Sequence, residues 1–206
     1  MLPRALFIFV LAFIFAGLEV EVEGKYGWSE KIPTWYRCNK FYGWLMAGKP
    51  LTGYHSYMFL LPITMFHIPF FLGLSWSLVK ELEILAVSWS FSPLWDFLWF
   101  VINPYYGVDN FKPGKIWWHK QWLGQLPKDY YWGWGLSILF AVLSGAVSFF
   151  GGSDFTTVVF NQCALLIWLI GLTMIVAFFL APSYHRWYFR MREVDERGKA
   201  GIYHSD

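Results

Sequence analysis

Residues 82–102 read LEILAVSWSFSPLWDFLWFVI, and this stretch decides the fold class. A transmembrane helix needs about 20 mainly apolar residues to cross roughly 30 Å of hydrocarbon. The stretch meets that length and holds only two charged residues, Glu83 at its start and Asp96 in its second half. It therefore predicts a membrane-spanning helix that contains an acidic group.

Four further apolar stretches come close to the same requirement, at residues 2–18, 54–79, 131–150 and 158–181. No internal repeat or low-complexity linker separates them. We therefore expect residues 1–206 to form a single all-α integral membrane domain, a bundle of five transmembrane helices. Only Lys80 and Glu81 separate the second and third stretches, which predicts a tight hairpin at that point. Residues 182–206 are expected to form a cytoplasmic tail.

Composition supports a membrane protein and excludes several soluble classes. Apolar residues make up 57% of the chain, aromatic residues 23% and charged residues 15%, whereas soluble domains have roughly 25% charged residues. A net charge of +2 provides no field for a polyanion, so a nucleic acid is not an expected partner. Cys38 and Cys163 are too few for a disulfide scaffold.

Positive charge sets the expected orientation, because cytoplasmic loops collect Lys and Arg. With the N-terminus outside and the C-terminus inside, fourteen of the sixteen cations lie on the cytoplasmic side, and Arg4 and Lys80 remain outside. A rival interpretation treats the first stretch as a cleaved signal peptide. Cleavage would move the five cations of the first loop outside, so we keep all five helices. A prokaryotic plasma membrane is the expected location.

The loop between the third and fourth predicted helices begins at Asn103 and includes His119. Asn-Pro, Pro-Gly and an isolated Gly107 are turn signals in this loop. Its many aromatic residues favour packing against the bundle or the bilayer, as amphipathic rings do at the headgroup layer. We therefore predict an ordered, aromatic-rich cytoplasmic loop.

Ionisable groups inside the membrane are costly, so they are candidates for function. Asp96 is the foremost one, and it requires a partner from another helix or from water. His67 lies between Pro62 and Pro69 in the second predicted helix. Because these prolines leave carbonyl groups free, His67 has two open interpretations: a metal ligand, or a neutral imidazole bonded to such a carbonyl.

The run Glu19-Val-Glu-Val-Glu23 gathers acidic groups at the cytoplasmic boundary. If the helix continues through it, Glu19 and Glu23 share a face and Glu21 points away. If the chain is extended, all three carboxylates share a face. Either geometry brings together like charges that a cation, a proton or basic side chains must compensate. A solvated acidic collar remains the alternative.

The topology thus brings acids and imidazoles to one membrane face, including His55 at the start of the second helix. Carboxylate and imidazole groups are suitable ligands for zinc, iron or manganese, and they also serve acid–base chemistry. We expect four catalytic candidates: Asp96, Glu19, Glu23 and His119. The candidate ligands of a divalent metal ion are Glu19, Glu23, Asp96, His67, His119 and His185.

Two functions of different classes follow. The first is a membrane protein with a carboxylate/His site at the cytoplasmic interface, metal-dependent or lipid-modifying, with membrane lipids as partners. The second is a non-catalytic accessory subunit that packs on other membrane subunits or on itself through small residues such as Ser137, Ala141 and Gly145. A transporter ranks third, because the chain shows no inverted repeat. No recognised metal-ligand or nucleophile motif decides between them.

Overall fold

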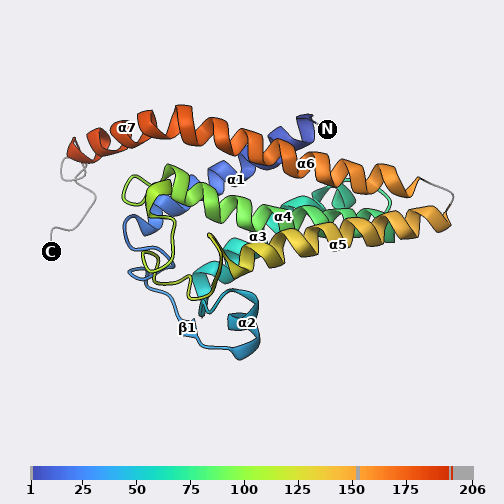
Figure 1. Cartoon of the computed structure of the whole chain (residues 1–206), viewed down its shortest axis with the longest axis horizontal. Coiled ribbons are helices and arrows are strands. Elements are labelled where there is room, and N and C mark those ends of the chain that lie inside the picture. The colour runs from blue at the N-terminus through green and yellow to red at the C-terminus, as the bar shows by residue number, and fades with distance from the viewer. Residues whose placement is uncertain (1, 152–153, 195, 197–206) are drawn as a thin grey trace.

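The computed structural model describes residues 2–151, 154–194 and 196. These residues form a mainly helical bundle (Figure 1). The helices are α1 (Leu2–Glu23), α2 (Lys40–Leu45), α3 (Gly53–Phe71), α4 (Leu78–Ile102), η1 (Val108–Asn110), α5 (Lys128–Phe150), α6 (Phe155–Ile175), η2 (Val176–Leu180) and α7 (Ala181–Glu193). Two short antiparallel pairs join β1 (Tyr36–Arg37) to β2 (Leu51–Thr52) and β3 (Trp122–Leu123) to β4 (Leu126–Pro127).

Four helices within the described residues are long and apolar enough to cross a membrane: α1, α4, α5 and the continuous helix Phe155–Glu193. The protein is therefore a multi-pass, helical membrane protein. The remaining long helix, α3, has 19 residues but is not one of these four, because polar residues such as His55 and His67 lower its hydropathy. It lies alongside α4, where the rings of Phe66 and Phe91 meet with centroids 5.4 Å apart.

The hairpin between α3 and α4 lies earlier than the sequence predicts. α3 ends at Phe71, and Gly73 adopts a left-handed φ of 100° in the turn that follows. Ser77 then caps α4 by accepting a hydrogen bond from the backbone N–H of Lys80. The expected boundaries of 54–79 and the turn at Lys80 and Glu81 are therefore wrong, because a glycine turn and a serine cap outweigh the apolar composition of residues 72–79.

The last helix continues well past the boundary expected at residue 181. A π-helical segment, η2, joins α6 to α7 without a break, and Pro182 occupies the first turn of α7, where its missing N–H is tolerated. The chain is helical to Glu193, so the first part of the expected tail is an extension of the bundle. Residues 195 and 197–206 of that tail lie outside the described part.

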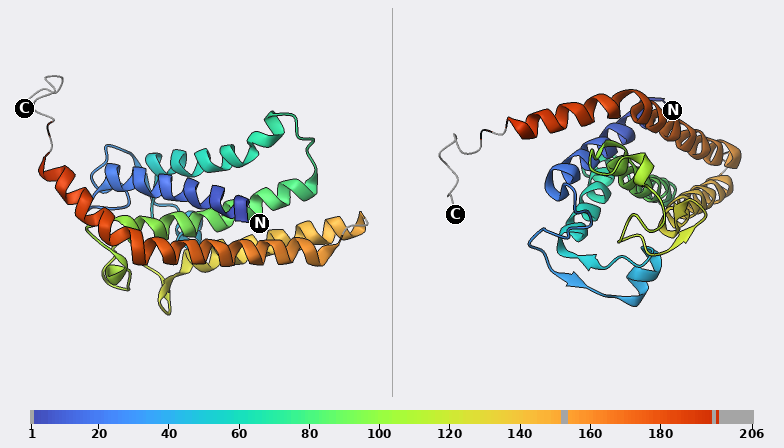
Figure 2. Two further views of the ribbon diagram at one scale, coloured as in Figure 1. Left: turned by 90° about the horizontal axis from the view of Figure 1, so that it is seen from above. Right: turned by 60° about the vertical axis from the view of Figure 1, so that its left-hand side comes forward.

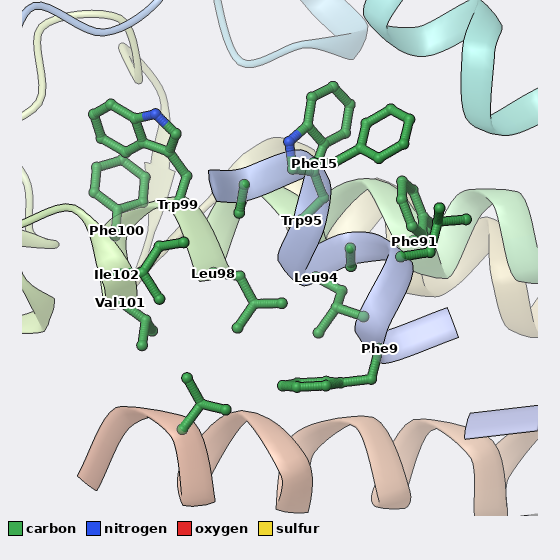
Figure 3. Close-up of a cluster of buried hydrophobic side chains, with 14 of the residues drawn as sticks. Phe9, Phe15, Phe91, Leu94, Trp95, Leu98, Trp99, Phe100, Val101 and Ile102 are labelled. Atoms are coloured by element: carbon green, nitrogen blue, oxygen red, sulfur yellow. The ribbon is translucent and has the colours of Figure 1, made fainter. Parts of the chain in front are cut away.

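α4 is the central helix of the core. In its last three turns, apolar side chains are buried on nearly every side because α1, α5, α6 and the two long loops surround it. Figure 3 shows Leu94 and Leu98 on one side of α4, near Phe9 of α1, and Trp95 and Trp99 on the other. Phe15 of α1 contacts Trp95 edge to face, with ring centroids 5.6 Å apart.

Small residues on α5 allow close packing within the chain. Ser137, Ala141 and Gly145 are all buried. Ser137 accepts a hydrogen bond from the Gln162 side chain of α6, and an added Cβ at Gly145 would lie 2.9 Å from the Phe155 ring. This row of small residues therefore packs against α6, as small residues do between membrane helices.

The two ends of the bundle differ sharply. The turn at residues 72–77, the end of α5 and the start of α6 lie at one end, whereas the loops 24–52 and 103–127 and helix α7 gather at the other (Figures 1 and 2). α1 and α4 end there, and α3 and α5 begin there. Glu19, Glu23, His55 and Asp96 all lie at this loop-rich end.

Candidate carboxylate and histidine site

A small polar cavity lies at the loop-rich end, between the ends of α1 and α4 and the starts of α3 and α5. Its volume is about 30 Å³, enough for one or two water-sized molecules, since a water needs roughly 10–15 Å³ on this scale. Its polar lining includes Glu19, Glu23, Lys49, His55, Asp96, Asp129 and Tyr130, and its apolar lining includes Trp28, Trp95, Trp99 and Trp118.

Glu19 and Glu23 enter the cavity from the last turns of α1. The helix continues to Glu23, so these two side chains share one face and Glu21 points elsewhere. Glu19 and Glu23 are 5% and 6% exposed, whereas the Glu21 side chain is 54% exposed and contacts Arg192 at 3.4 Å. Of the two geometries open in the sequence, the structure has the helical one.

His55 faces both carboxylates from the first turn of α3. Its Nε2 lies 3.7 Å from Oε1 of Glu19 and 3.7 Å from Oε1 of Glu23. Its Nδ1 lies 2.8 Å from the hydroxyl of Thr52, which caps α3, and 3.0 Å from that of Ser29. The hydroxyl groups thus orient the ring so that Nε2 points at the two glutamates.

A strained turn supports this arrangement. Trp28 and Ser29 have left-handed φ angles of 44° and 58°, a conformation that costs non-glycine residues about 1–3 kcal/mol each. The turn directs the backbone N–H of Ser29 to Glu23, at 2.6 Å, and stacks the Trp28 ring on His55, with centroids 3.8 Å apart. Backbone strain of this kind is concentrated at functional sites.

Asp96 is the meeting point of a second group. Its Oδ2 accepts a hydrogen bond from Tyr130 at 2.6 Å and lies 3.2 Å from Nε2 of His119. Its Oδ1 lies 3.5 Å from Nζ of Lys49. The Asp96 side chain is 24% exposed, while those of Lys49 and His119 are almost fully buried, so Asp96 is the member of this group that faces the cavity most openly.

Lys49 is a buried cation whose place in this cavity no sequence pattern indicates. Its Nζ lies 2.8 Å from Oδ2 of Asp129 and 4.6 Å from the centre of the Trp28 ring. Burial alone lowers the pKa of Lys49, but Asp129 and Asp96 raise it by more, so that its pKa lies above the ordinary 10.5. Lys49 is therefore charged at neutral pH.

Two indole N–H groups also line the cavity. Trp95 and Trp99, one turn apart on α4, are each 3% exposed. Within the described part of the chain the Nε1 of Trp99 has no hydrogen-bond partner, whereas the Trp95 indole lies close enough to the Glu19 carboxylate to interact with it. Figure 3 shows that the nitrogen atoms lie on the sides of the two rings that face each other. Since buried donors are normally satisfied, the Trp99 indole N–H is available to an acceptor in the cavity.

The charges of the cavity do not balance within the described chain. Glu19, Glu23, Asp96 and Asp129 supply four carboxylates, and Lys49 supplies one ammonium group. Uncompensated buried charge is strongly destabilising, so protons, histidine cations or a metal ion must offset the excess. One ligand atom from each of Glu19, Glu23 and His55 lies within 4.8 Å of the other two.

Glu19, Glu23 and His55 form a group that could hold a metal ion. Ligand distances of about 2.0–2.2 Å place tetrahedral ligand atoms roughly 3.4 Å apart, and the Nε2–Oε1 distances here are 3.7 Å. Two carboxylates and one imidazole suit zinc, manganese or iron in the divalent state. Such a site leaves at least one coordination position open to water or substrate.

The structure brings together four of the residues expected from the sequence, Glu19, Glu23, Asp96 and His119, in or directly behind the cavity. It places two others elsewhere. His67 lies near the opposite end of the bundle, where it contacts Glu81 at 3.0 Å and the carbonyl of Ile63 at 2.7 Å. Ile63 is not one of the residues whose carbonyls the prolines free, which are Met58 and Met65.

His185 lies on α7, where its Nε2 lies 3.1 Å from the carbonyl oxygen of Val101 at the end of α4. It is not part of the cavity lining. The ring instead bonds a carbonyl group in the last turn of α4, where the last four carbonyls of a helix lack intrahelical partners.

Several site residues have no signal in the sequence beyond their residue type. Lys49 and Asp129 look like ordinary loop and helix-start charges, and Trp95 and Trp99 look like membrane-anchoring aromatics. The sequence places His55 at the same end as the other candidates, but it was not predicted to be a metal ligand. Its Thr52 cap, which sets the ring orientation, is the feature that a search for helix starts would have found.

The chain was also compared with known proteins. No family model, no curated protein and no solved structure matches this chain.

Proposed function

We propose that this protein is a membrane-embedded, metal-dependent enzyme that acts on a lipid headgroup at the cytoplasmic boundary of the membrane. The observation that carries the proposal is the convergence of Glu19, Glu23 and His55 on one cavity that also holds the Trp95 and Trp99 N–H groups. Carboxylates alone would not suffice, because acidic clusters are common. The Trp99 indole N–H, which has no partner among the described residues, adds a donor for an acceptor beside the cation.

In this proposal Glu19, Glu23 and His55 hold a divalent transition-metal ion. A bound metal lowers the pKa of its water and polarises an ester or phosphoester oxygen. The indole N–H group of Trp99 then donates to the oxygen on which negative charge develops, as donors do in an oxyanion hole.

Asp96 is the proposed proton carrier. Its Oδ1 has only the long contact with Lys49, at 3.5 Å, among the described residues, so a water can donate a hydrogen bond to it. Because Lys49, His119 and Tyr130 stabilise the ionised carboxylate, Asp96 is a weak base that would take the proton only while the water attacks. With water as the nucleophile, attack on the ester carbon or phosphorus would release the alcohol, and Asp96 would return the proton to the leaving oxygen. Water is the only co-reactant. Tyr130, His119 and Lys49 position the Asp96 carboxylate.

Metal analysis of the purified protein tests the first step. After incubation with zinc or manganese and removal of excess ion, wild type should retain about one equivalent per chain, as expected for a single three-ligand site. The variants Glu19→Gln, Glu23→Gln and His55→Gln should lose it. Glu21→Gln is the matched control, because Glu21 lies on the same helix but outside the cavity. Equal retention by wild type and the Glu19→Gln/Glu23→Gln double variant would refute metal binding.

Lipid turnover tests the second step. Phosphatidylglycerol and phosphatidylethanolamine vesicles should release a headgroup or fatty acid when they contain the metal-loaded protein. Asp96→Asn should keep the metal and lose the turnover. A variant that loses both would assign Asp96 to metal binding instead.

The proposed topology has five membrane-crossing helices, including α3, with the N-terminus outside and the C-terminus inside. At about 1.5 Å per residue, the 19 residues of α3 reach roughly 28 Å, close to the hydrocarbon thickness. Labelling with an impermeant maleimide tests this. Native Cys38, in the loop-rich end and exposed, should react only after lysis, whereas Ser75→Cys in a Cys38→Ser background should react on intact cells. Labelling of Cys38 on intact prokaryotic cells would invert the topology.

The accessory-subunit alternative makes less use of the structure. The small residues that it assigns to a partner, such as Ser137, Ala141 and Gly145, are buried within the chain against α6. Two results together would favour that alternative. The protein would purify in mild detergent with a stable, stoichiometric partner subunit, and neither Glu19→Gln nor Glu23→Gln would change metal retention.

A further inference from the structure

A larger cavity, of about 450 Å³, lies between α4, α5 and α6. This volume falls in the range of roughly 300–1,000 Å³ typical of ligand pockets. The cavity is lined almost entirely by apolar side chains, among them Leu94, Phe97, Trp134, Ile138, Leu169 and Ile170. It was not apparent from the sequence.

The hydroxyl groups in this lining are already satisfied. The Ser90 hydroxyl donates to the carbonyl of Val87, that of Thr173 donates to Leu169, and that of Tyr130 donates to Asp96. The wall therefore presents hydrocarbon and offers little to water, and apolar cavities of this kind stay dry. The apolar lining of the cavity therefore favours an apolar ligand.

The cavity is elongated and open to the side. Tyr130, Trp134 and Ile138 line it at intervals of four residues along α5, which spans about 12 Å at 1.5 Å per residue. Ile138 and Ile170 are 41% and 58% exposed, so the rim lies on the outer surface of the candidate membrane helices. In a bilayer, the molecules that meet this rim are acyl chains.

The apolar cavity adjoins the polar one. Pro93 and Tyr130 line both, and the Tyr130 hydroxyl bonds Asp96 while its ring forms part of the apolar wall. A molecule whose chain lies along α5 toward Tyr130 therefore brings its polar end to the carboxylate and histidine site. This is the arrangement that an amphipathic lipid requires.

We infer that the cavity between α4, α5 and α6 binds one acyl chain of a membrane phospholipid, with the glycerol end of the chain toward Tyr130 and Asp96. The inference rests on the proposed function for the fate of the headgroup, and it names the substrate class as a lipid recognised by its chain. Chain selectivity then comes from the length of the cavity.

Photo-cross-linking in nanodiscs tests this inference. Phosphatidylcholine nanodiscs are doped with a phosphatidylglycerol that carries a diazirine either near the glycerol or at the end of one acyl chain. The glycerol-side probe should label residues near 126–130 and 173–174, and the chain-end probe should label residues near 134–138 and 166–170. This order follows from the direction of α5 and α6 relative to the polar cavity.

Two tryptophan variants on α6 supply the matched comparison. Ile170→Trp fills the cavity, whereas Ile167→Trp adds the same ring at a residue that is 70% exposed and outside the cavity lining. Both substitutions lie on the outer surface, so both variants should fold. Labelling of the residues that line the cavity should fall several-fold in Ile170→Trp and remain at the wild-type level in Ile167→Trp.

Labels spread evenly along α6 and unaffected by Ile170→Trp would overturn the inference. Zinc retention, measured on the same samples, separates this failure from that of the proposed function. Even labelling with intact zinc binding refutes the chain site alone. Ordered labelling without zinc binding supports the chain site and refutes the metal-dependent function.

Discussion

The Lys49 ammonium nitrogen lies 2.8 Å from Oδ2 of Asp129, a residue eighty positions later in the chain. The pair joins the loop before α3 to the first turn of α5, and its side chains are only 1% and 8% exposed. Asp96 on α4 and His119 in the second long loop complete the same group. These charged side chains therefore also hold the two long loops against α4 and α5.

Replacing Lys49 with Met should destabilise the protein by about 3–5 kcal/mol, because it leaves Asp129 and Asp96 buried without their cation. Lys115→Met, at an exposed lysine of the second loop, is the control and should change little. Thermal unfolding in detergent measures both. The double variant Lys49→Met/Asp129→Asn should recover part of the loss, since it removes the orphaned charge together with the cation. Additive losses would show that the two residues are not coupled.

The stabilisation from Lys49 should depend on pH only in the alkaline range. Its pKa in the folded protein is raised above 10.5 by Asp129 and Asp96 after the opposing effect of burial. A raised pKa contributes stability that is fully present below 10.5 and is lost as the pH rises through the folded value. The difference in melting temperature between wild type and Lys49→Met should therefore be constant near neutral pH and shrink at strongly alkaline pH. A difference that shrinks below neutrality would assign the effect to other groups.

Two glycines on α5 should respond in opposite directions to alanine. A Cβ at Gly133 would lie 2.9 Å from the ring of Pro93 and 3.1 Å from the carbonyl oxygen of Trp89, whereas one at Gly135 meets nothing within 4 Å. Alanine favours a helix over glycine by about 0.8–1.0 kcal/mol. Gly135→Ala should stabilise the protein by up to about that amount, and Gly133→Ala should destabilise it by separating α5 from α4. Urea or thermal unfolding of the pair provides the comparison, and stabilisation by both would contradict this packing.

His67→Gln should leave metal retention unchanged. The imidazole lies at the opposite end of the bundle from the cavity and bonds Glu81 and the carbonyl of Ile63. A modest loss of thermal stability is expected, because the contact with Glu81 ties α3 to α4. Loss of the metal in His67→Gln, with wild-type folding, would require a different ligand set from Glu19, Glu23 and His55.

How far the sequence predicts this molecule depends on whether a feature is local. Apolar stretches give the helices, because each must be long enough to cross hydrocarbon and satisfies its own backbone. Helix ends are less well predicted where a cap decides them, as at Ser77, or where no stop signal exists, as between α6 and α7. The continuation of α1 through Glu23 was one of two open geometries.

The site is predicted in part for the same reason. Glu19, Glu23, Asp96 and His119 carry signals in the sequence, since acids and imidazoles at membrane depth are unusual. Lys49, Asp129 and the two indole donors come together only through tertiary packing across intervals of tens of residues. No periodicity records such long-range pairing, so His67 and His185 could not be told apart from true neighbours of the cavity.

The order of synthesis along the chain determines when the polar cavity can form. Glu19 and Glu23 leave the ribosome first. Lys49, α4 and the Asp129 end of α5, which surround them, follow over about the next hundred residues. N-terminal segments begin to fold before the rest of a chain is made. Until then the two glutamates must remain hydrated at the membrane surface. The polar cavity therefore forms late in biogenesis. A chain truncated before α5 would insert its first helices without assembling the carboxylate and histidine site.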